Sequence, residues 1–216
     1  MIDLHTHTVF SDGELIPAEL ARRAKVAGYR ALAITDHADA SNLELILMHV
    51  RAVKEYGIYM DLQILTGVEL THVPPGLIAQ EVARARDLGA DIVVVHGETI
   101  VEPVERGTNL AAIEAGADVL AHPGLITAED ARLAAERGVL LEITTRGGHG
   151  YTNGHVVQMA RLHGAQLVIN NDAHAPKDLV GADLRKKIAL GAGMSVEEIQ
   201  SAEECARALV SRKLSL

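Results

Sequence analysis

Short apolar runs alternate with longer amphipathic stretches along the whole chain. The runs are rich in Val, Ile, Leu and Ala, which is typical of strands buried in a parallel sheet. The longer stretches repeat apolar residues every three or four positions, as helices with one buried face do. The predicted strands are residues 2–4, 31–34, 62–68, 92–95, 119–121, 139–143 and 167–169, and the predicted helices are residues 17–27, 43–56, 78–88, 128–137 and 156–163.

Glycine marks many junctions between a predicted helix and the strand that follows it. Gly138 and Gly164, for example, stand directly after predicted helices, where a left-handed backbone favours glycine. Seven strand-helix units favour a closed or nearly closed barrel over a six-stranded doubly wound sheet. The sequence therefore predicts an α/β fold and a single domain over residues 1–216. Residues 191–216 are predicted to form two short helices that pack outside the barrel as a C-terminal cap.

The composition narrows the range of partners. The 216 residues are 48% hydrophobic but include only one Phe, four Tyr and no Trp, so aromatic platforms on which bases stack are not expected. The formal net charge of -9 disfavours broad binding to nucleic acid or to an anionic membrane. We therefore expect neither nucleic acid nor a membrane as a partner.

The cysteine content and the lengths of the apolar runs indicate the cellular compartment. Cys205 is the only cysteine, so no intrachain disulfide can form, which favours a reducing compartment. The first residues lack the pattern of an export signal, and no apolar run reaches the ~20 residues that a membrane span requires. We expect a cytoplasmic protein, and the sequence leaves its oligomeric state open.

The chain contains eleven histidines, more than twice the number of Phe and Tyr residues together, and six of them follow predicted strands. In parallel barrels, the C-terminal strand ends and the loops after them build the active site. His5 and His7 alternate along an extended segment, so both rings project to one side. Asp172 and His174 repeat this spacing after the last strand. Imidazoles with carboxylates suit Zn, Mn or Fe, whereas Mg favours an all-oxygen set of ligands.

These strand-end residues form motifs that resemble the PHP (polymerase and histidinol phosphatase) domain family over the whole chain. Each of the nine positions at which the family usually carries a metal ligand is matched. The motifs are His5-Thr6-His7-Thr8 followed by Ser11-Asp12-Gly13, then Thr35-Asp36-His37, Gly67-Val68-Glu69 and Asn171-Asp172-Ala173-His174, with His96 and His122 as the family's two middle histidines.

The resemblance implies a distorted seven-stranded (β/α)7 TIM-like barrel with three clustered divalent transition-metal ions, which are Zn, Mn or Fe or a mixture. Nine ligands exceed what one zinc site uses, and they suit three ions with positions left open for water or substrate. The resemblance assigns one ion to His5, His7, Glu69 and Asp172, a second to Asp12, His37 and His174, and a third to His96, His122 and the shared Glu69.

The charge of such a centre indicates its substrate. Three divalent ions outweigh three carboxylates, and the excess positive charge suits a phosphate dianion better than an uncharged amide. The sequence therefore predicts a histidinol-phosphatase-like phosphoesterase, in which a metal-activated hydroxide attacks a small phosphomonoester and Glu69 and Asp172 are catalytic residues. The physiological leaving group is not predicted.

Three residues outside the ligand set are also predicted to act at this site. Arg146 lies in a glycine-rich loop after the sixth predicted strand and is expected to clamp the substrate phosphate. His149, in the same loop, is expected to protonate the leaving alkoxide. Asp3, two residues before the first histidine, is the predicted hydrogen-bond partner of a ligand imidazole.

Two other functions stay open, and a third is rejected. The same metal chemistry could cleave nucleic acid or a nucleotide phosphodiester, although the acidic balance argues against this. A non-catalytic scaffold or RNA-processing subunit could use the same barrel, but it need not keep such a costly polar cluster. Amidohydrolases also begin with His-X-His, but their fourth strand typically ends in a modified lysine, where this chain has His96.

Overall fold

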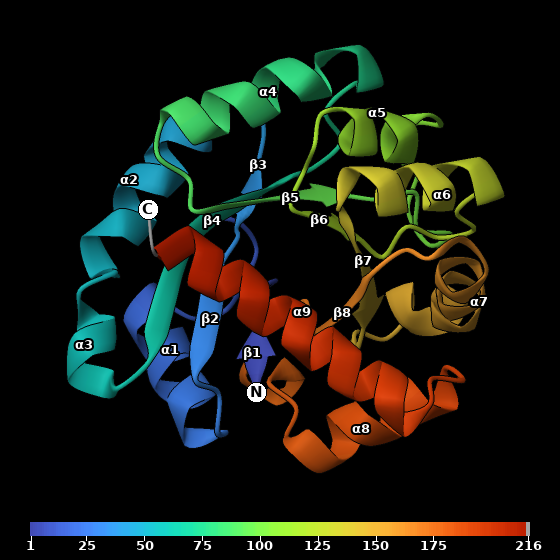
Figure 1. Cartoon of the computed structure of the whole chain (residues 1–216). Coiled ribbons are helices and arrows are strands. Elements are labelled where there is room, and N and C mark those ends of the chain that lie inside the picture. The colour runs from blue at the N-terminus through green and yellow to red at the C-terminus, as the bar shows by residue number, and fades with distance from the viewer. Residues whose placement is uncertain (215–216) are drawn as a thin grey trace.

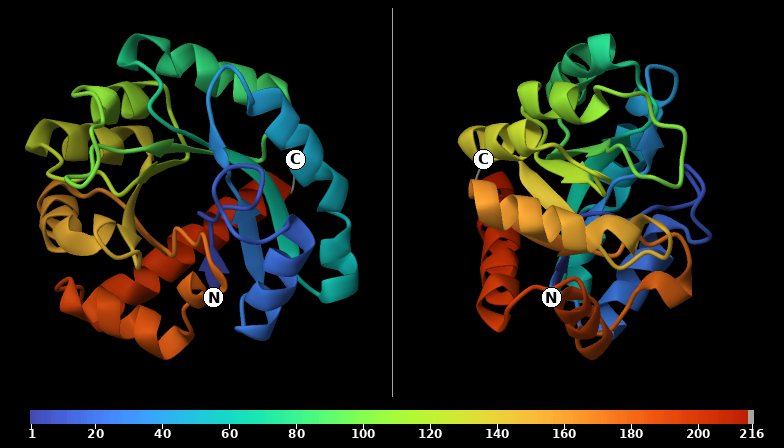
Figure 2. Two further views of the ribbon diagram at one scale, coloured as in Figure 1. Left: turned by 180° about the vertical axis from the view of Figure 1, so that it is seen from behind. Right: turned by 90° about the vertical axis from the view of Figure 1, so that its right-hand side faces the viewer.

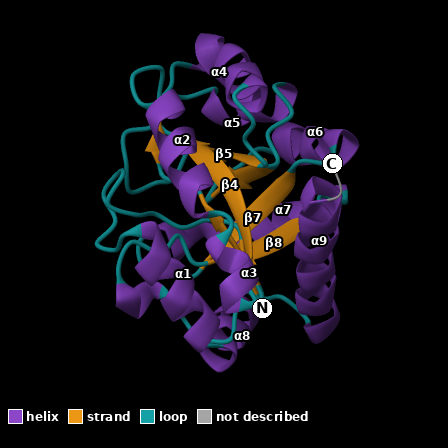
Figure 3. Ribbon diagram, turned by 90° about the vertical axis from the view of Figure 1, so that its left-hand side faces the viewer, coloured by secondary structure: helices purple, strands orange, loops and turns teal. Residues whose placement is uncertain are grey.

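The computed structural model describes residues 1–214 and contains a curved parallel sheet surrounded by helices (Figure 3). Seven strands follow one another in the order β1-β2-β4-β5-β6-β7-β8, and the short β3 pairs with β4 just beyond β2. All pairs are parallel. The strands are β1 Ile2–Asp3, β2 Ala31–Ile34, β3 His37–Ala38, β4 Gln63–Leu70, β5 Ile92–His96, β6 Val119–Ala121, β7 Leu140–Thr144 and β8 Leu167–Asn170.

The sheet closes between its first and last strands. Thr6 forms an isolated parallel bridge with Ala173, and the amide of His7 donates to the carbonyl of Ala173 over 2.9 Å. The amide of Leu4 donates to the side-chain oxygen of Asn170 over 3.0 Å. These few contacts replace a regular ladder, so the barrel is nearly closed. The predicted seven-stranded barrel is confirmed.

The helices follow the strands as the apolar pattern predicts, with several differences. The predicted helix 43–56 is divided into two, and helices 108–114 and 182–191 were not predicted. Both α4 and α7 begin three residues early, α4 because Pro75 suits the first helical turn. The helices are α1 Pro17–Val26, α2 Leu43–Val53, α3 Tyr56–Met60, α4 Pro75–Asp87, α5 Thr108–Glu114, α6 Ala128–Arg137, α7 Asn153–His163, α8 Ala182–Gly191 and α9 Val196–Leu214, with 3-10 turns η1 His149–Thr152 and η2 Pro176–Asp178.

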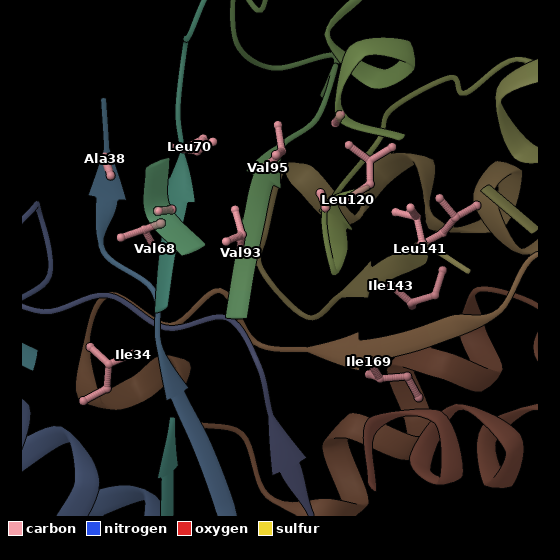
Figure 4. Close-up of a cluster of buried hydrophobic side chains, with 14 of the residues drawn as sticks. Ile34, Ala38, Val68, Leu70, Val93, Val95, Leu120, Leu141, Ile143 and Ile169 are labelled. Carbon is pink, nitrogen blue, oxygen red and sulfur yellow. The ribbon is translucent and has the colours of Figure 1, made fainter. Parts of the chain in front are cut away.

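Two hydrophobic clusters lie on the two faces of the sheet. Successive side chains of a strand point to opposite faces, so Val93 and Val95 join the cluster beneath the helices, whereas Ile92 and Val94 join the barrel interior. Figure 4 shows the outer cluster, in which Leu120, from β6, also lies. This burial on both faces explains why the strands read as nearly continuous apolar runs.

Helix α9 closes the N-terminal mouth of the barrel. Its Ala206, Leu209 and Val210 are buried in the interior cluster, and Figure 1 shows the helix crossing the strands. Instead of the two short helices predicted over residues 191–216, these apolar residues form the stripe of one helix of 19 residues. The last two residues of the predicted cap, 215–216, lie outside the described residues.

Because α9 covers one mouth, the polar residues at strand ends gather at the other. Seen from behind, α9 lies at the far side of the strands, and the loops after the strand ends face the viewer (Figure 2). Across residues 1–214, no helix combines the length and apolar character needed to cross a membrane.

Candidate metal centre

The nine ligands predicted from the sequence meet at the C-terminal mouth of the barrel. Seven of them are buried or nearly so, whereas the side chain of Asp12 is about half exposed at 56% and that of His37 is partly exposed. The predicted ligands follow β1, β2, β6 and β8 or lie in the last two residues of β4 and β5, and the one that follows β2 also begins the short β3. They are His5, His7, Asp12, His37, Glu69, His96, His122, Asp172 and His174.

Glu69 and Asp172 lie at the middle of this cluster. One carboxylate oxygen of Glu69 is 3.2 Å from Nε2 of His5 and 3.6 Å from Nε2 of His122. Its other oxygen is 3.6 Å from Nε2 of His7. Oδ1 of Asp172 is 3.3 Å from the same nitrogen of His7. The two carboxylates can therefore be shared between neighbouring ions.

A second group lies toward the rim. Oδ1 of Asp12 is 3.1 Å from Nε2 of His174 and 3.5 Å from Nε2 of His37. The ring of His7 stacks on that of His174 with centroids 4.0 Å apart. One donor atom of each of these four residues lies within 4.8 Å of the others, so the group can hold one ion.

The third group consists of imidazoles. His96, His122 and His149 each offer a ring nitrogen within 4.8 Å of the others, and all three are buried. The sequence placed only the first two in a metal position. The structure therefore adds a histidine to this group.

The buried polar atoms of the cluster have the character of metal ligands. Within residues 1–214, Nε2 of His5, both ring nitrogens of His7, Nδ1 of His122 and one oxygen of Glu69 are buried without a hydrogen-bond partner. Unpartnered buried polar atoms are rare and destabilising in native proteins. Imidazole and carboxylate are the donors that zinc, manganese and iron accept, so these residues fit such ions.

Backbone strain accompanies the ligands. His122 and Asp172 have φ angles of 27° and 53°, a region that residues with side chains rarely adopt. Such strain persists only where surrounding contacts impose it, and it concentrates at functional sites. The backbone at His122 and Asp172 is therefore held in an unfavourable conformation that directs their side chains into the cluster.

Burial and neighbouring charges shift the protonation of the ligands. Burial lowers the pKa of His7 and of His122 well below the usual range, which keeps both rings neutral and able to bind metal. Burial alone would raise the pKa of Glu69, but the imidazoles of His5 and His37 outweigh it and hold that pKa well below its ordinary value. Burial raises the pKa of Asp172 to about 7, so this carboxylate needs nearby positive charge to stay ionised.

The predicted role of Asp3 is wrong. Its carboxylate accepts hydrogen bonds from the backbone amide and the side-chain amide of Asn171, over 3.1 and 2.6 Å, and reaches only the backbone amide of His5. The ring of His5 is instead 2.8 Å from Glu142, a buried residue of β7. A single acidic residue inside the otherwise apolar run 139–143 was the signal that could have identified this partner.

A second residue missed by the sequence analysis is Glu102, in the loop between β5 and α5. Its carboxylate is 3.1 Å from Nε2 of His96 and 3.4 Å from Nε2 of His149. The loop residues around Glu102 carry no periodic pattern, so the sequence does not indicate which of its acidic residues turns toward the cluster.

Arg146 lies at the rim beside Asp172. Its Nη1 donates to the backbone carbonyl of Asp172 over 3.2 Å, and its Nε is 3.6 Å from the carboxylate. Arg146 and Lys177 line a shallow pocket of about 340 Å³ next to His174. The guanidinium therefore lies between Asp172 and this pocket.

Comparison with known proteins identifies the family. The PHP domain model matches residues 3–100, a segment that holds six of the nine predicted ligands. A protein of Methanocaldococcus jannaschii named "Uncharacterized protein MJ1295" is 54% identical over 202 residues, which cover 92% of this chain and 93% of that protein. The chain belongs to the PHP domain family. The remaining predicted ligands of this PHP domain, His122, Asp172 and His174, lie beyond the matched segment but join the same cluster.

More distant similarities extend to other enzymes. The DNA polymerase/3'-5' exonuclease PolX of Bacillus subtilis is 25% identical over 193 residues, which cover 80% of this chain but 34% of that protein. In structure, the chain resembles the candidate histidinol phosphatase hisK of Listeria monocytogenes, with a TM-score of 0.60, 16% identity and coverage of 82% and 97% of the two chains. A Xaa-Pro dipeptidase is also similar, with a TM-score of 0.65, 15% identity and coverage of 99% and 75%. At these identities the two structures show a shared barrel only.

Proposed function

We propose that this PHP domain hydrolyses small phosphomonoesters at a centre of three divalent transition-metal ions. The observation that carries the proposal is the set of four overlapping ligand groups that share His5, His7 and His122 at one barrel mouth. Their unpartnered buried nitrogens and oxygens need cations to compensate them. Family membership agrees with a metal-dependent reaction.

The proposed ligand sets follow the family pattern. His5, His7, Glu69 and Asp172 would hold one ion, and Asp12, His37 and His174 a second, while His96 and His122 would hold a third with Glu69. When bound, such ions would polarise the phosphoryl oxygens and lower the pKa of a water molecule. Zn, Mn and Fe suit these ligands.

The electrostatics favour a phosphate group as the substrate's reacting part. Three divalent ions would carry six positive charges, against five carboxylates once Glu102 and Glu142 are included with Asp12, Glu69 and Asp172. A positive balance remains, and the partly exposed Arg146 adds to it at the rim. Its planar guanidinium can hold two phosphate oxygens and orient the phosphorus toward the cluster.

The pocket beside His174 supports a small leaving group. Its volume of about 340 Å³ lies at the low end of the range for small-molecule sites. Its rim carries Arg146 and Lys177 together with Glu14 and Asp178, so it offers both signs of charge to a polar substrate. The net charge of the chain, -9, disfavours a long nucleic acid.

A second candidate is cleavage of a phosphodiester, as in a nuclease, and the similarity to PolX supports it. The metal chemistry is shared by both reactions. The two candidates differ in what must lie beside the metal ligands, which is a small polar leaving group for one and a polynucleotide for the other.

Turnover measurements separate these candidates. Protein loaded with Mn, Zn or Fe would be assayed on phosphomonoesters, on bis(p-nitrophenyl) phosphate and on oligonucleotides. We expect the highest kcat/KM for a phosphomonoester, about three ions per chain by elemental analysis, and loss of both metal and turnover in Asp172→Ala. Preference for oligonucleotides would favour the nuclease. Failure of the wild type to turn over any of these substrates would favour a scaffold.

A further inference from the structure

His149 is built into the cluster rather than exposed on the loop that follows β7. The residue is 6% exposed, and its Nδ1 is 2.8 Å from the hydroxyl of Thr99. This hydrogen bond turns the other ring nitrogen, Nε2, toward the metal ligands. Hydrogen bonding through one ring nitrogen is the usual way in which a protein orients a histidine for coordination through the other.

The neighbouring rings converge on the same point. The ring of His149 stacks on that of His122 with centroids 4.2 Å apart and lies edge-on to His96 at 5.9 Å. Each of the three residues offers a nitrogen within 4.8 Å of the others. Three buried imidazoles at this separation repel one another if they are protonated, whereas a shared cation would bring them together.

Glu102 supplies an oxygen to the same place. Its Oε2 is 3.1 Å from Nε2 of His96, and its Oε1 is 3.4 Å from Nε2 of His149. Two ligands that bind one tetrahedral ion through bonds of about 2.1 Å lie roughly 3.4 Å apart. The carboxylate therefore stands at the separation from both rings that a common ion would produce.

We propose that His149 and Glu102 complete the third metal position together with His96 and His122. The inference rests on the proposed metal centre and goes beyond the nine ligands of the family pattern. That pattern leaves this position with two histidines and the shared Glu69, whose Oε1 is 3.6 Å from Nε2 of His122. With the two additional residues, the third position would have as many protein ligands as any other position in the centre.

This role differs from the proton-donor role that the sequence predicts for His149. Removal of the side chain has different consequences in the two cases. Loss of a ligand weakens the binding of one ion and slows the hydrolysis of all substrates. Loss of a proton donor leaves the ions in place and slows mainly those substrates whose leaving groups are poor. Metal binding, measured without turnover, therefore distinguishes the two roles.

The test compares His149→Ala with wild type and with His155→Ala. His155 is a matched control because it lies on the adjacent helix α7 and bonds through Nε2 to the backbone carbonyl of Ile126, away from the cluster. Each metal-free protein is titrated with Co²⁺, with its visible absorption as the readout, and the bound ions are counted by elemental analysis. We expect wild type and His155→Ala to bind three ions and His149→Ala to bind its third ion at least 10-fold more weakly.

Two further variants test the same inference if His149→Ala fails to fold. Thr99→Val keeps the shape of the side chain but removes the hydroxyl that orients the ring, and Glu102→Gln removes the carboxylate charge. We expect both to weaken the third ion by a smaller factor than His149→Ala does, with circular dichroism unchanged.

Retention of three ions with wild-type affinity and spectrum in all three variants would overturn the inference. A loss of rate that grows with the pKa of the leaving group, with metal retained, would return His149 to the proton-donor role. A wild-type protein that binds no transition ion would overturn the metal centre itself, and this inference with it.

Discussion

The carboxylate of Glu142 lies 2.8 Å from Nδ1 of His5, and both side chains are fully buried. The same oxygen accepts a hydrogen bond from the side-chain amide of Asn170 over 2.9 Å. Within residues 1–214 the other oxygen is buried without a partner. Through Nδ1, Glu142 fixes the tautomer of His5 that presents Nε2 to the centre, which is how carboxylates support ligand histidines.

The first prediction concerns this pair. Glu142→Gln keeps a hydrogen-bond acceptor but loses the charge, and Glu142→Leu loses both, so metal affinity should fall by about 10-fold to 100-fold, more in Glu142→Leu. Glu142→Leu also leaves Nδ1 of His5 and the side-chain amide of Asn170 buried without their acceptor, so it should lower the melting temperature of chelator-treated protein as well. Metal titration and thermal melts with and without chelator test this. A merely structural Glu142 would give the lower melting temperature with unchanged metal affinity.

Much of the fold is readable from the sequence because each strand is buried on both faces. The continuous apolar runs of β5 and β6 give the strand positions within a residue. The packing position of α9 could not be predicted in this way. Its buried residues, such as Ala206 and Leu209, are spaced as in any amphipathic helix, and only the tertiary structure shows that this stripe faces the mouth of the barrel.

The residues of the candidate site also fall into those that the sequence predicts and those that it does not. Ligands such as Glu69 and His96 are visible in the sequence because strand ends of a parallel barrel must meet at one mouth. Glu142 does not lie at a strand end: it lies within a strand and contacts the cluster only through a predicted ligand, His5. Glu102 lies in a loop, where no periodicity indicates the direction of a side chain. Sequence patterns therefore predict what regular elements position, and they miss what loops and interior packing add.

The second prediction concerns pH and activity. Burial lowers the pKa of His5, but Glu69, Glu142 and Asp172 outweigh it and raise that pKa well above its usual value, and the pKa of His37 is also raised. These rings gain protons first as the pH falls, and a protonated ring cannot bind metal. Activity and bound metal should therefore fall together as the pH falls, and because these two pKa values are raised the loss should begin above pH 6.5, the ordinary His pKa. A pH profile with parallel metal analysis tests this, and full activity at about pH 4.5 would contradict a histidine-held centre.

The third prediction concerns Asp3 and stability. Burial raises the pKa of Asp3 from 3.8 to about 6, so the folded chain binds a proton here more tightly than the unfolded chain does. This group therefore lowers the free energy of unfolding as the pH rises from about 4 to about 6. Asp3→Asn removes the charge, so its melting temperature relative to wild type should be higher at pH 8 than at pH 5, by about 2 to 4 °C for each kcal/mol involved.

The measurement for Asp3 uses chelator-treated protein, because metal binding has its own dependence on pH. Asp183→Asn is the matched control, since Asp183 is an exposed aspartate on α8 that pairs with Lys187. It should show no such difference between the two pH values. Equal shifts in Asp3→Asn at pH 5 and pH 8 would mean that the Asp3 carboxyl does not titrate between them.

The last prediction concerns Arg146, whose guanidinium stands at the rim beside Asp172. If it holds the substrate phosphate, Arg146→Ala should lose about 1.5 to 3 kcal/mol of transition-state binding, or roughly 10-fold to 100-fold in kcat/KM. Arg146→Lys should recover part of the loss, because an ammonium restores the charge without the paired geometry. Lys177→Ala, in the same pocket, is the control and should have a smaller effect. Because Arg146 also contacts Asp172, bound metal must be counted in each variant. Wild-type kcat/KM in Arg146→Ala, with full metal content, would leave phosphate binding to the ions alone.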